Sequence, residues 1–428
     1  MKRASIIFLI LLFILFLGGF FYWKSLLFLE KKVMAPTPEP QETKEKLQEE
    51  LTEPSQPGEI SMAIQRIVSS AKKFIDEKKK FLETEKARKR SENVKGLYMN
   101  EFVANSKSIG ATKIREDIKK LLFETELNAI VIDVKEAYGP NLPSSLKKLI
   151  GEFKEKNFWV IARICVFRDS SLVNKKPELY LKSKSGDFWK DYKGNYWLDP
   201  QSSEVKHYLI EFSKKVIDFG FDELQFDYIR FPSDGNLEDI VYPAYDGKKE
   251  KREVIREFFS NLSKELKSYK SEIILSVDLF GLVAIQYVEP GVGQSLEDAA
   301  EFFDYISPML YPSHFYGGFE AKEDFERGLP ALYFPYEAED ISQVVSNHPY
   351  EVIFRSILSA SDYLLELGLD AQIRPWLQDF SLRVDTERGI YYDAEKVKAQ
   401  IRAAEDAGAS GWLLWNPANI YTEAALKK

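Results

Sequence analysis

An acid and a base stand at the end of an apolar run in the middle of the sequence. Residues 221–232 read FDELQFDYIRFP, and Gln225, Asp227 and Arg230 interrupt its aromatic and aliphatic side chains. Apolar cores resist charged groups, so charges at the end of such a run indicate a site. Pro232 cannot continue a strand, which places the polar residues at the carboxyl end of the strand.

A second acid has the equivalent position in the next apolar run. Asp278 lies near the end of ILSVDLF, as Asp227 lies near the end of its own run. Neighbouring strands are ~4.8 Å apart, so the two carboxyl groups can flank one bond, and burial with charge repulsion raises the pKa of one of them. Two carboxyl groups with separated pKa values perform glycoside hydrolysis, and a short separation favours retention of configuration.

The two acids are expected to have different roles. Asp227 stays ionised as the nucleophile or charge stabiliser, and Asp278 is the general acid that protonates the leaving group. Glu136, which ends an earlier apolar run, is the reserve catalytic acid.

Other polar and aromatic residues near the ends of the runs are expected to bind the substrate. When the runs are aligned by alternation, these side chains point toward one axis, where a packed barrel would hold Val, Ile and Leu. Any one of them could instead form an internal ion pair, Asp227 with Arg163 for example, but the whole set favours a solvated pocket. The expected substrate-binding residues are Asp133, Arg163, Gln225, Arg230, Tyr311, His314, Trp376, Gln378 and Trp415.

Eight apolar runs, separated by amphipathic helical patterns, must position these residues. Residues 93–428 are therefore predicted to form an α/β fold, a (β/α)8 TIM barrel with its site at the carboxyl ends of the strands. A doubly wound open sheet is the alternative, although the first run leads into NEFVANSKSIG, which lacks GxGxxG. The predicted strands are Val94–Met99, Ala129–Glu136, Phe158–Phe167, Glu223–Phe231, Ile273–Phe280, Tyr305–Tyr311, Gln372–Leu377 and Gly411–Trp415.

Two long connections are predicted to cover the top face of the barrel. Residues 168–200 contain SKSGDFWKDYKGNYWLDP, which reads as a hairpin with two aromatic clusters, and residues 317–370 contain Tyr333, Phe334 and Tyr336. Exposed rings in such loops stack on sugars. The competing interpretation is that the rings fill a small core within each loop.

Three segments with different compositions precede the barrel. Residues 1–30 contain the uncharged run Ile6–Trp23, about 27 Å long as a helix, which predicts a transmembrane signal anchor. A cleavable signal peptide is the alternative, but no small-x-small cleavage site ends the run. Residues 31–59 read as a Pro/Glu-rich linker. Residues 60–92 predict an amphipathic helix or stalk; packing on the next domain competes with a short coiled coil that makes a weak homo-oligomer through residues 60–90.

Charge and composition exclude several kinds of partner. A formal net charge of −8, with no basic block in the barrel region, argues against nucleic acid. Cys165 is the single cysteine, so no intramolecular disulfide can form. His207, His314 and His348 lack the spacing of zinc ligands, and the acidic loop at residues 234–239 lacks that of a known calcium loop. No metal and no cofactor are therefore expected.

Nine motifs in order along the chain carry a resemblance to a known family. They are GLYMNE, NAIVIDVKEAYG, ARICVFRD, WLDPQSSEV, LQFDYIRFPSDG, LSVDLFG, ISPMLYPSHF, IRPWLQDF and GWLLWNP. With them the chain resembles the bacterial putative glycosyl hydrolase domain family, of the TIM-barrel glycosidase superfamily, over about Asn93 to Ile420. The resemblance implies a (β/α)8 fold and hydrolysis of O-glycosidic bonds in an exported polysaccharide. The acid pair is also similar to the amylase-like layout, in which Glu stands at the position of Asp278. The fourth predicted strand, with FDELQFDYIRF, keeps part of the chitinase-like DxxDxDxE motif.

Together these observations predict a single-pass protein of the cell membrane, a glycoside hydrolase whose catalytic domain lies outside the cytoplasm. Its partners are expected to be the membrane and a polysaccharide or cell-wall glycan; secretion is the alternative location. A barrel that binds glycan without cutting it, and so tethers the cell wall, is the alternative function. Only the enzyme needs two carboxyl groups with separated pKa values.

Overall fold

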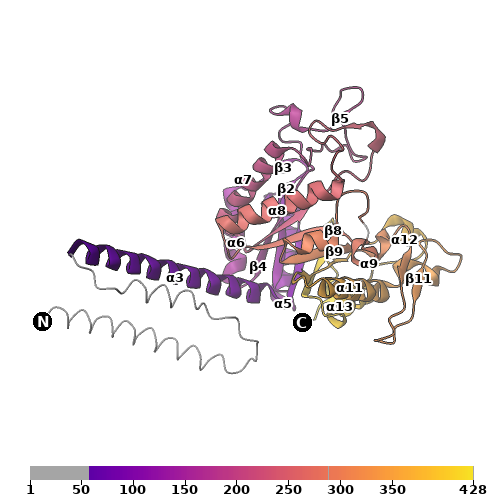
Figure 1. Ribbon diagram of the computed structural model, residues 1–428. Coiled ribbons are helices and arrows are strands. Elements are labelled where there is room, and N and C mark those ends of the chain that lie inside the picture. The colour runs from indigo at the N-terminus through magenta and orange to yellow at the C-terminus, as the bar shows by residue number, and fades with distance from the viewer. Residues whose placement is uncertain (1–56, 288, 428) are drawn as a thin grey trace. The chain divides into compact units, whose positions relative to one another are not determined.

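The computed structural model describes residues 57–287 and 289–427 (Figure 1). The predicted anchor Ile6–Trp23 and nearly all of the predicted linker lie outside these residues. No helix in the described part is long and apolar enough to cross a membrane. From Ile75 onward the described residues form one compact unit, which contains the barrel. The helix predicted over residues 60–92 is present as α3 (Pro57–Ser91).

Eight parallel strands form a closed barrel. The first strand pairs with both the second and the last, since Gly96 lies opposite Ala129 and Val94 lies opposite Gly411. Closure excludes the open-sheet alternative and confirms the predicted (β/α)8 fold. The strands are β1 (Val94–Met99), β2 (Ala129–Glu136), β4 (Trp159–Cys165), β6 (Glu223–Asp227), β8 (Ile274–Phe280), β9 (Tyr305–Leu310), β12 (Gln372–Ile373) with β13 (Trp376–Gln378), and β14 (Gly411–Trp415).

Among the strands whose bounds differ from the predicted ones, the fourth and the seventh do so for identifiable backbone reasons. The fourth strand of the barrel, β6, ends at Asp227 because Tyr228 has a left-handed φ of 51°, so Arg230 lies in the following loop. The seventh strand is interrupted between β12 and β13 because Pro375 has no N–H to donate. Its register is unbroken, since Ile373 pairs with Ile306 and Trp376 pairs with Met309 on β9.

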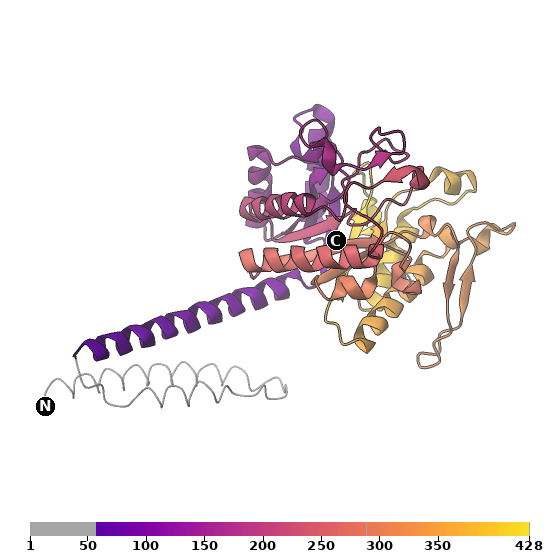
Figure 2. The ribbon, with the colours of Figure 1, turned by 45° about the horizontal axis from the view of Figure 1, so that its top comes forward.

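Helices surround the barrel and bury their apolar faces against its strands. Helices α7 and α8 lie side by side, as do α11 and α13 (Figures 1 and 2). Ser108, Ser202 and Asp393 cap the N-termini of α5, α7 and α13 with their side-chain oxygens. The helices are α4 (Glu101–Asn105), α5 (Ile109–Glu124), α6 (Ser144–Glu155), α7 (Ser203–Phe219), α8 (Lys251–Tyr269), α9 (Val283–Gln286), α10 (Leu296–Ala300), α11 (Pro349–Glu366), α12 (Arg383–Glu387) and α13 (Ala394–Asp406).

The two long connections are ordered, and most of their rings pack within them. In residues 168–200, Lys190 pairs antiparallel with Tyr196, and β5 (Lys182–Ser183) pairs with β7 (Ile240–Val241). Trp189 and Trp197 of this loop are buried, which favours the interpretation that its rings fill a core.

The second connection contains the hairpin of β10 (Phe319–Ala321) and β11 (Leu332–Phe334), which projects from the barrel in Figure 2. Phe334 stacks on His348 with ring centroids 3.7 Å apart. Tyr333, by contrast, is 67% exposed and is available to stack on a ligand.

Candidate active site

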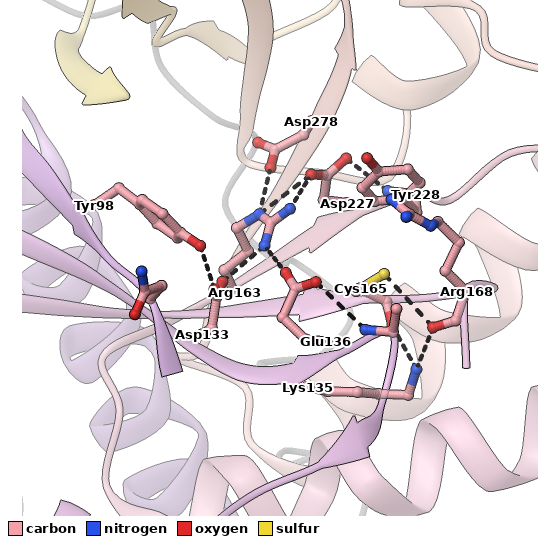
Figure 3. Close-up of polar contacts among 12 residues, drawn as sticks. Tyr98, Asp133, Lys135, Glu136, Arg163, Cys165, Arg168, Asp227, Tyr228 and Asp278 are labelled. Carbon is pink, nitrogen blue, oxygen red and sulfur yellow. Dashed lines mark hydrogen bonds and ion pairs between the residues drawn. The ribbon is translucent and has the colours of Figure 1, made fainter. Parts of the chain in front are cut away.

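Arg163, on β4, lies at the centre of four carboxyl groups (Figure 3). These groups belong to Asp133 and Glu136 on β2, Asp227 on β6 and Asp278 on β8. Arg163 Nη1 donates to Asp133 Oδ1 at 2.7 Å and to Glu136 Oε1. Its Nη2 and Nε both donate to Asp227 Oδ2, at 2.5 and 3.2 Å. Asp278 Oδ2 lies 3.8 Å from the same Nε. The guanidinium therefore holds four acids from three other strands around one point.

The strand register brings Asp227 and Asp278 to the same depth in the barrel. The last paired residues of β6 and β8 are Phe226 and Val277, and the two acids are the next residues on each strand. Because their Oδ2 atoms lie 3.2 and 3.8 Å from Arg163 Nε, these oxygens are no more than about 7 Å apart. Two carboxyl groups at this separation can act on one bond.

Burial changes the protonation of two of the four acids. Burial, followed by the charge of Asp227, raises the pKa of Asp278 well above its usual range. Burial also raises the pKa of Asp133 to about 7, against the opposing effect of Arg163. The site thus holds two carboxyl groups whose pKa values lie above the usual range, as a proton donor that works near neutral pH requires.

Aromatic side chains form one wall of the site. Trp376 Nε1 donates to Asp278 Oδ1 at 2.8 Å, and Tyr98 Oη donates to Asp133 Oδ2. Tyr98 stacks on Trp415 with centroids 3.9 Å apart, and Trp415 is only half-buried. Trp415 is therefore a partly exposed aromatic ring next to the acids.

Buried polar contacts lie below the site, toward the amino ends of the strands. Arg374 Nη1 donates to Glu223 at 2.9 Å, and Trp159 Nε1 donates to the same carboxylate at 2.8 Å. Arg374 Nη2 also donates to the carbonyl of Ser91, at the end of α3. This closed layer is fully buried and holds β4, β6 and the interrupted seventh strand in place.

Comparisons with known proteins give the family. Residues 141–421, more than half of the chain, match a family described as a putative glycosyl hydrolase domain. The chain belongs to this family. A comparison with the curated proteins found no match.

Solved structures are similar to the chain, and one of them shares its fold. The glycoside hydrolase domain of PgaB (BpsB) from Bordetella bronchiseptica is 13% identical, covers 77% of this chain and 94% of its own, and has a TM-score of 0.51. A hypothetical protein from Ruminiclostridium thermocellum ATCC 27405 is 34% identical over 42% of this chain and 96% of its own, with a TM-score of 0.36. The glycoside hydrolase domain of PelA from Pseudomonas aeruginosa is 12% identical over 77% and 96%, with a TM-score of 0.39.

The family match covers a shorter range than the motifs predicted. It begins at residue 141, so β1 and β2 precede it, and with them Tyr98, Asp133 and Glu136. Arg163 and the acids Asp227 and Asp278 lie within the matched range.

Several of the expected substrate-binding residues lie together with the four acids. Asp133, Arg163, Trp376 and Trp415 make the contacts described above. Tyr311 is buried, and burial, followed by the charges of Asp278 and Asp227, raises the pKa of its phenol well above the usual range.

Other expected residues contact different groups. Gln225 lies one layer lower, where its Nε2 donates to Ser307 Oγ at 3.2 Å. Gln378 is fully buried and its Nε2 donates to Ser313 Oγ at 2.7 Å, so it positions the loop after β9. His314 is exposed and stacks on Tyr316.

Sequence reasoning did not single out Tyr98, Tyr228 or the role of Lys135. Tyr98 is the second-last residue of the first barrel strand, and a hydroxyl in GLYMNE near a strand end was the available signal. The left-handed φ of Tyr228 has no signal in the sequence. Lys135 is fully buried, donates to the carbonyl of Cys165 at 2.6 Å and pairs with Asp169 at 2.9 Å, and so holds the chain where β4 ends.

The acidic loop beside the site makes contacts within the protein. Asp234 Oδ1 accepts the N–H of Tyr192 at 3.0 Å, and Asp239 Oδ1 accepts the N–H of Lys184 at 3.1 Å. These carboxylates fix the loop of residues 168–200. In the described residues, no group of three or more His, Cys, Asp or Glu side chains could hold a metal ion.

Proposed function

We propose that the chain is a glycoside hydrolase that cleaves O-glycosidic bonds of a polysaccharide or cell-wall glycan with two carboxyl groups. The observation that carries the proposal is the placement of Asp227 and Asp278 on adjacent strands around one Arg163. The family of the chain supports the same reaction class.

In the proposed mechanism the two acids divide the work. Asp278, held neutral by burial and by the charge of Asp227, donates its proton to the glycosidic oxygen. Asp227 accepts two hydrogen bonds from Arg163, which stabilise a carboxylate that attacks or shields the anomeric carbon. Water then completes hydrolysis. Adjacent strands favour the separation of about 5–5.5 Å that retaining enzymes use, and the bound of about 7 Å is compatible with it, so we expect retention.

Glu136 is the second candidate for the proton donor. Its side chain is 27% exposed, whereas that of Asp278 is 1% exposed, so Glu136 is the more accessible of the two. Both contact the same guanidinium, and the longer side chain of Glu136 reaches further toward the mouth.

A glycan-binding barrel without catalysis is the alternative, and one observation favours it. Arg163 and Asp227 are 3% and 9% exposed and form an ion pair, which a purely structural cluster would also contain. The half-buried Trp415 would serve a binding module as well as an enzyme.

Hydrolysis of a polysaccharide panel by the full chain separates the two functions. We expect new reducing ends from at least one polymer, with a rate that depends on Asp227. Saturable binding of a polymer, with no reducing ends released from any member of the panel, would establish the binding module.

We further propose that residues Ile6–Trp23 anchor the protein in the cell membrane, with the barrel outside the cytoplasm. The uncharged length of this run and the absence of a small-x-small site after it support the proposal.

A further inference from the structure

Arg230 is a buried guanidinium that pairs with no carboxylate in the described part of the chain. Arg230 is only 6% exposed to solvent. Within residues 57–287 and 289–427, its hydrogen bonding to protein consists of one bond, from Nη1 to the carbonyl of the adjacent Phe231 at 3.0 Å. A guanidinium has five N–H donors, so most of its donor capacity is available to a ligand.

The positive charges of the other two arginines of the site are paired with carboxylates. Arg163 pairs with the acids described above, and Arg168 Nε lies 3.2 Å from Asp191 Oδ2. Burial opposes the charge of each, but neighbouring groups outweigh it and raise the pKa of both. Burial lowers the pKa of Arg230, because the charges of Tyr228, Asp227 and Asp234 offset only part of the lost hydration.

Arg230 lies over the carboxyl ends of the two strands that carry the acid pair. Its guanidinium carbon is 5.1 Å from the ring centroid of Tyr228 and 4.7 Å from that of Phe280. Tyr228 directly follows Asp227, and Phe280 is two residues beyond Asp278. The third ring around the guanidinium is that of Trp197, from the loop of residues 168–200, whose centroid lies 5.3 Å from the guanidinium carbon.

Tyr228 contributes a second donor at this place, because its hydroxyl makes no hydrogen bond within the described part of the chain. The guanidinium carbon of Arg168 also lies near the ring of Tyr228, 4.2 Å from its centroid. Figure 3 shows Tyr228 and Arg168 on the side of Asp227 that is away from Tyr98. Burial, and then the charge of Asp227, raises the pKa of the Tyr228 phenol to about 12, so the hydroxyl keeps its proton. The left-handed φ of Tyr228 is a strained conformation of the kind that clusters at binding sites.

We propose that Arg230 and Tyr228 bind an anionic substituent of the glycan, a carboxylate or a sulfate or phosphate ester, next to the acid pair. The substrate is therefore an acidic polysaccharide. A planar guanidinium suits such groups because it donates two parallel hydrogen bonds. The protein carries a formal net charge of −8, so an acidic polymer needs a local cationic site of this kind. The substrate class rests on the proposed hydrolase function; the anion site itself does not.

Binding of matched polymers to the full chain tests the proposal. The acidic probes are polygalacturonate, hyaluronan and dextran sulfate; the neutral probes are methyl-esterified pectin, carboxyl-reduced hyaluronan and dextran. We expect at least one acidic polymer to bind at least 10-fold tighter than its neutral counterpart. Carboxylate and sulfate sources are distinguished by which pair shows the difference.

Variants locate the effect. Arg230→Met keeps the volume and removes the charge, and we expect it to abolish the preference while leaving Tm unchanged or higher. Arg230→Lys keeps the charge without the fork and should restore only part of the preference. Arg402→Met removes an exposed arginine from α13 and should leave the preference unchanged.

Three results would overturn the proposal: no acidic polymer binds, wild-type protein shows no preference, or Arg230→Met keeps it. A fall in Tm with an unchanged preference would make Arg230 a packing residue. Hydrolysis of neutral glycans without any acidic preference would leave the hydrolase function standing and remove this inference. A preference for acidic polymers without hydrolysis of any polymer would support the anion site and remove the hydrolase function.

Discussion

At the scale of single residues, Arg163 decides how the four acids behave. A guanidinium shared by several carboxylates tolerates the loss of one partner better than an isolated buried pair, which loses ~3–5 kcal/mol. The chemical role of each acid can therefore be separated from its role in stability by conservative substitution.

Asp227→Asn should lower activity by a factor of about 10² or more and change stability little. The amide still accepts a hydrogen bond from Arg163, which keeps Asp133 and Glu136 as partners, but it can no longer act as a nucleophile. Reducing-end assays and urea unfolding measure the two effects, with Asp406→Asn on α13 as a matched control. A destabilised variant with full activity would make Asp227 a structural partner of Arg163.

Asp278→Asn and Glu136→Gln should differ in their pH profiles. The raised pKa of Asp278 keeps it protonated to higher pH than an ordinary carboxyl group, so wild-type activity should fall on the alkaline side as this group ionises. Asp278→Asn should lose about 10²-fold or more in rate, and Glu136→Gln should lose less than about 10-fold and keep the alkaline limb. If Glu136→Gln is the inactive variant, the proton donor is Glu136.

Asp133 should make the protein less stable as the pH rises from about 4 to about 7. Its pKa is about 7 in the folded protein and about 4 in an unfolded chain, so the folded state binds the additional proton in this window. The stability that this group contributes is full below about pH 4 and is lost as the pH approaches 7. Asp133→Asn should flatten the dependence of Tm on pH, and parallel curves for the two proteins would contradict the assignment.

At the scale of elements, closure of the barrel depends on the contact between β14 and β1. Gly411 begins β14 with a φ of 90°, and a Cβ there would meet the carbonyl oxygen of Val94 at 2.0 Å. The strand that carries Trp415 can therefore start only with glycine.

Gly411→Ala should destabilise the protein by about 2 kcal/mol or more, because strain and a backbone clash act together. Gly151→Ala in α6 is the matched control, since nothing lies within 4 Å of its added Cβ. In a helix this control should be neutral or stabilise by about 0.5–1 kcal/mol. Equal unfolding midpoints for the two variants would show that β14 tolerates a shift against β1.

At the scale of the whole molecule, the predicted anchor determines where the barrel works. The full chain should fractionate with membranes, and a variant lacking residues 1–30 should be recovered in the soluble fraction. Protease added to intact cells should remove the barrel if it lies outside the cytoplasm. A mature soluble protein that begins near Ala35 would establish a cleaved signal peptide and secretion instead.

A second prediction at this scale is that α3 forms a coiled coil between copies of the chain. Ile67, Phe74 and Phe81 are exposed along its described length, so a coiled coil through residues 60–90 remains a prediction. Light scattering of the full chain in detergent would measure it.

The sequence alone determined the fold, because apolar runs of strand length alternate with amphipathic helical patterns eight times. It also predicted the acid pair, since Asp227 and Asp278 interrupt runs in which a charge is costly. What it could not determine was which polar groups meet, because that depends on register across strands far apart in the chain. Arg163 alone contacts acids from residues 133 to 278.

Backbone conformation was also decided only by the tertiary structure. The turn at Tyr228 ends β6 and moves Arg230 from the strand into the loop, where three rings surround it. Its φ is held by the packing of neighbouring loops rather than by a local residue preference, since tyrosine rarely adopts it. The packing of the aromatic rings of residues 168–200 on one another was also not predictable from the sequence. Their contacts depend on how the folded loop brings them together, which their spacing in the sequence does not show.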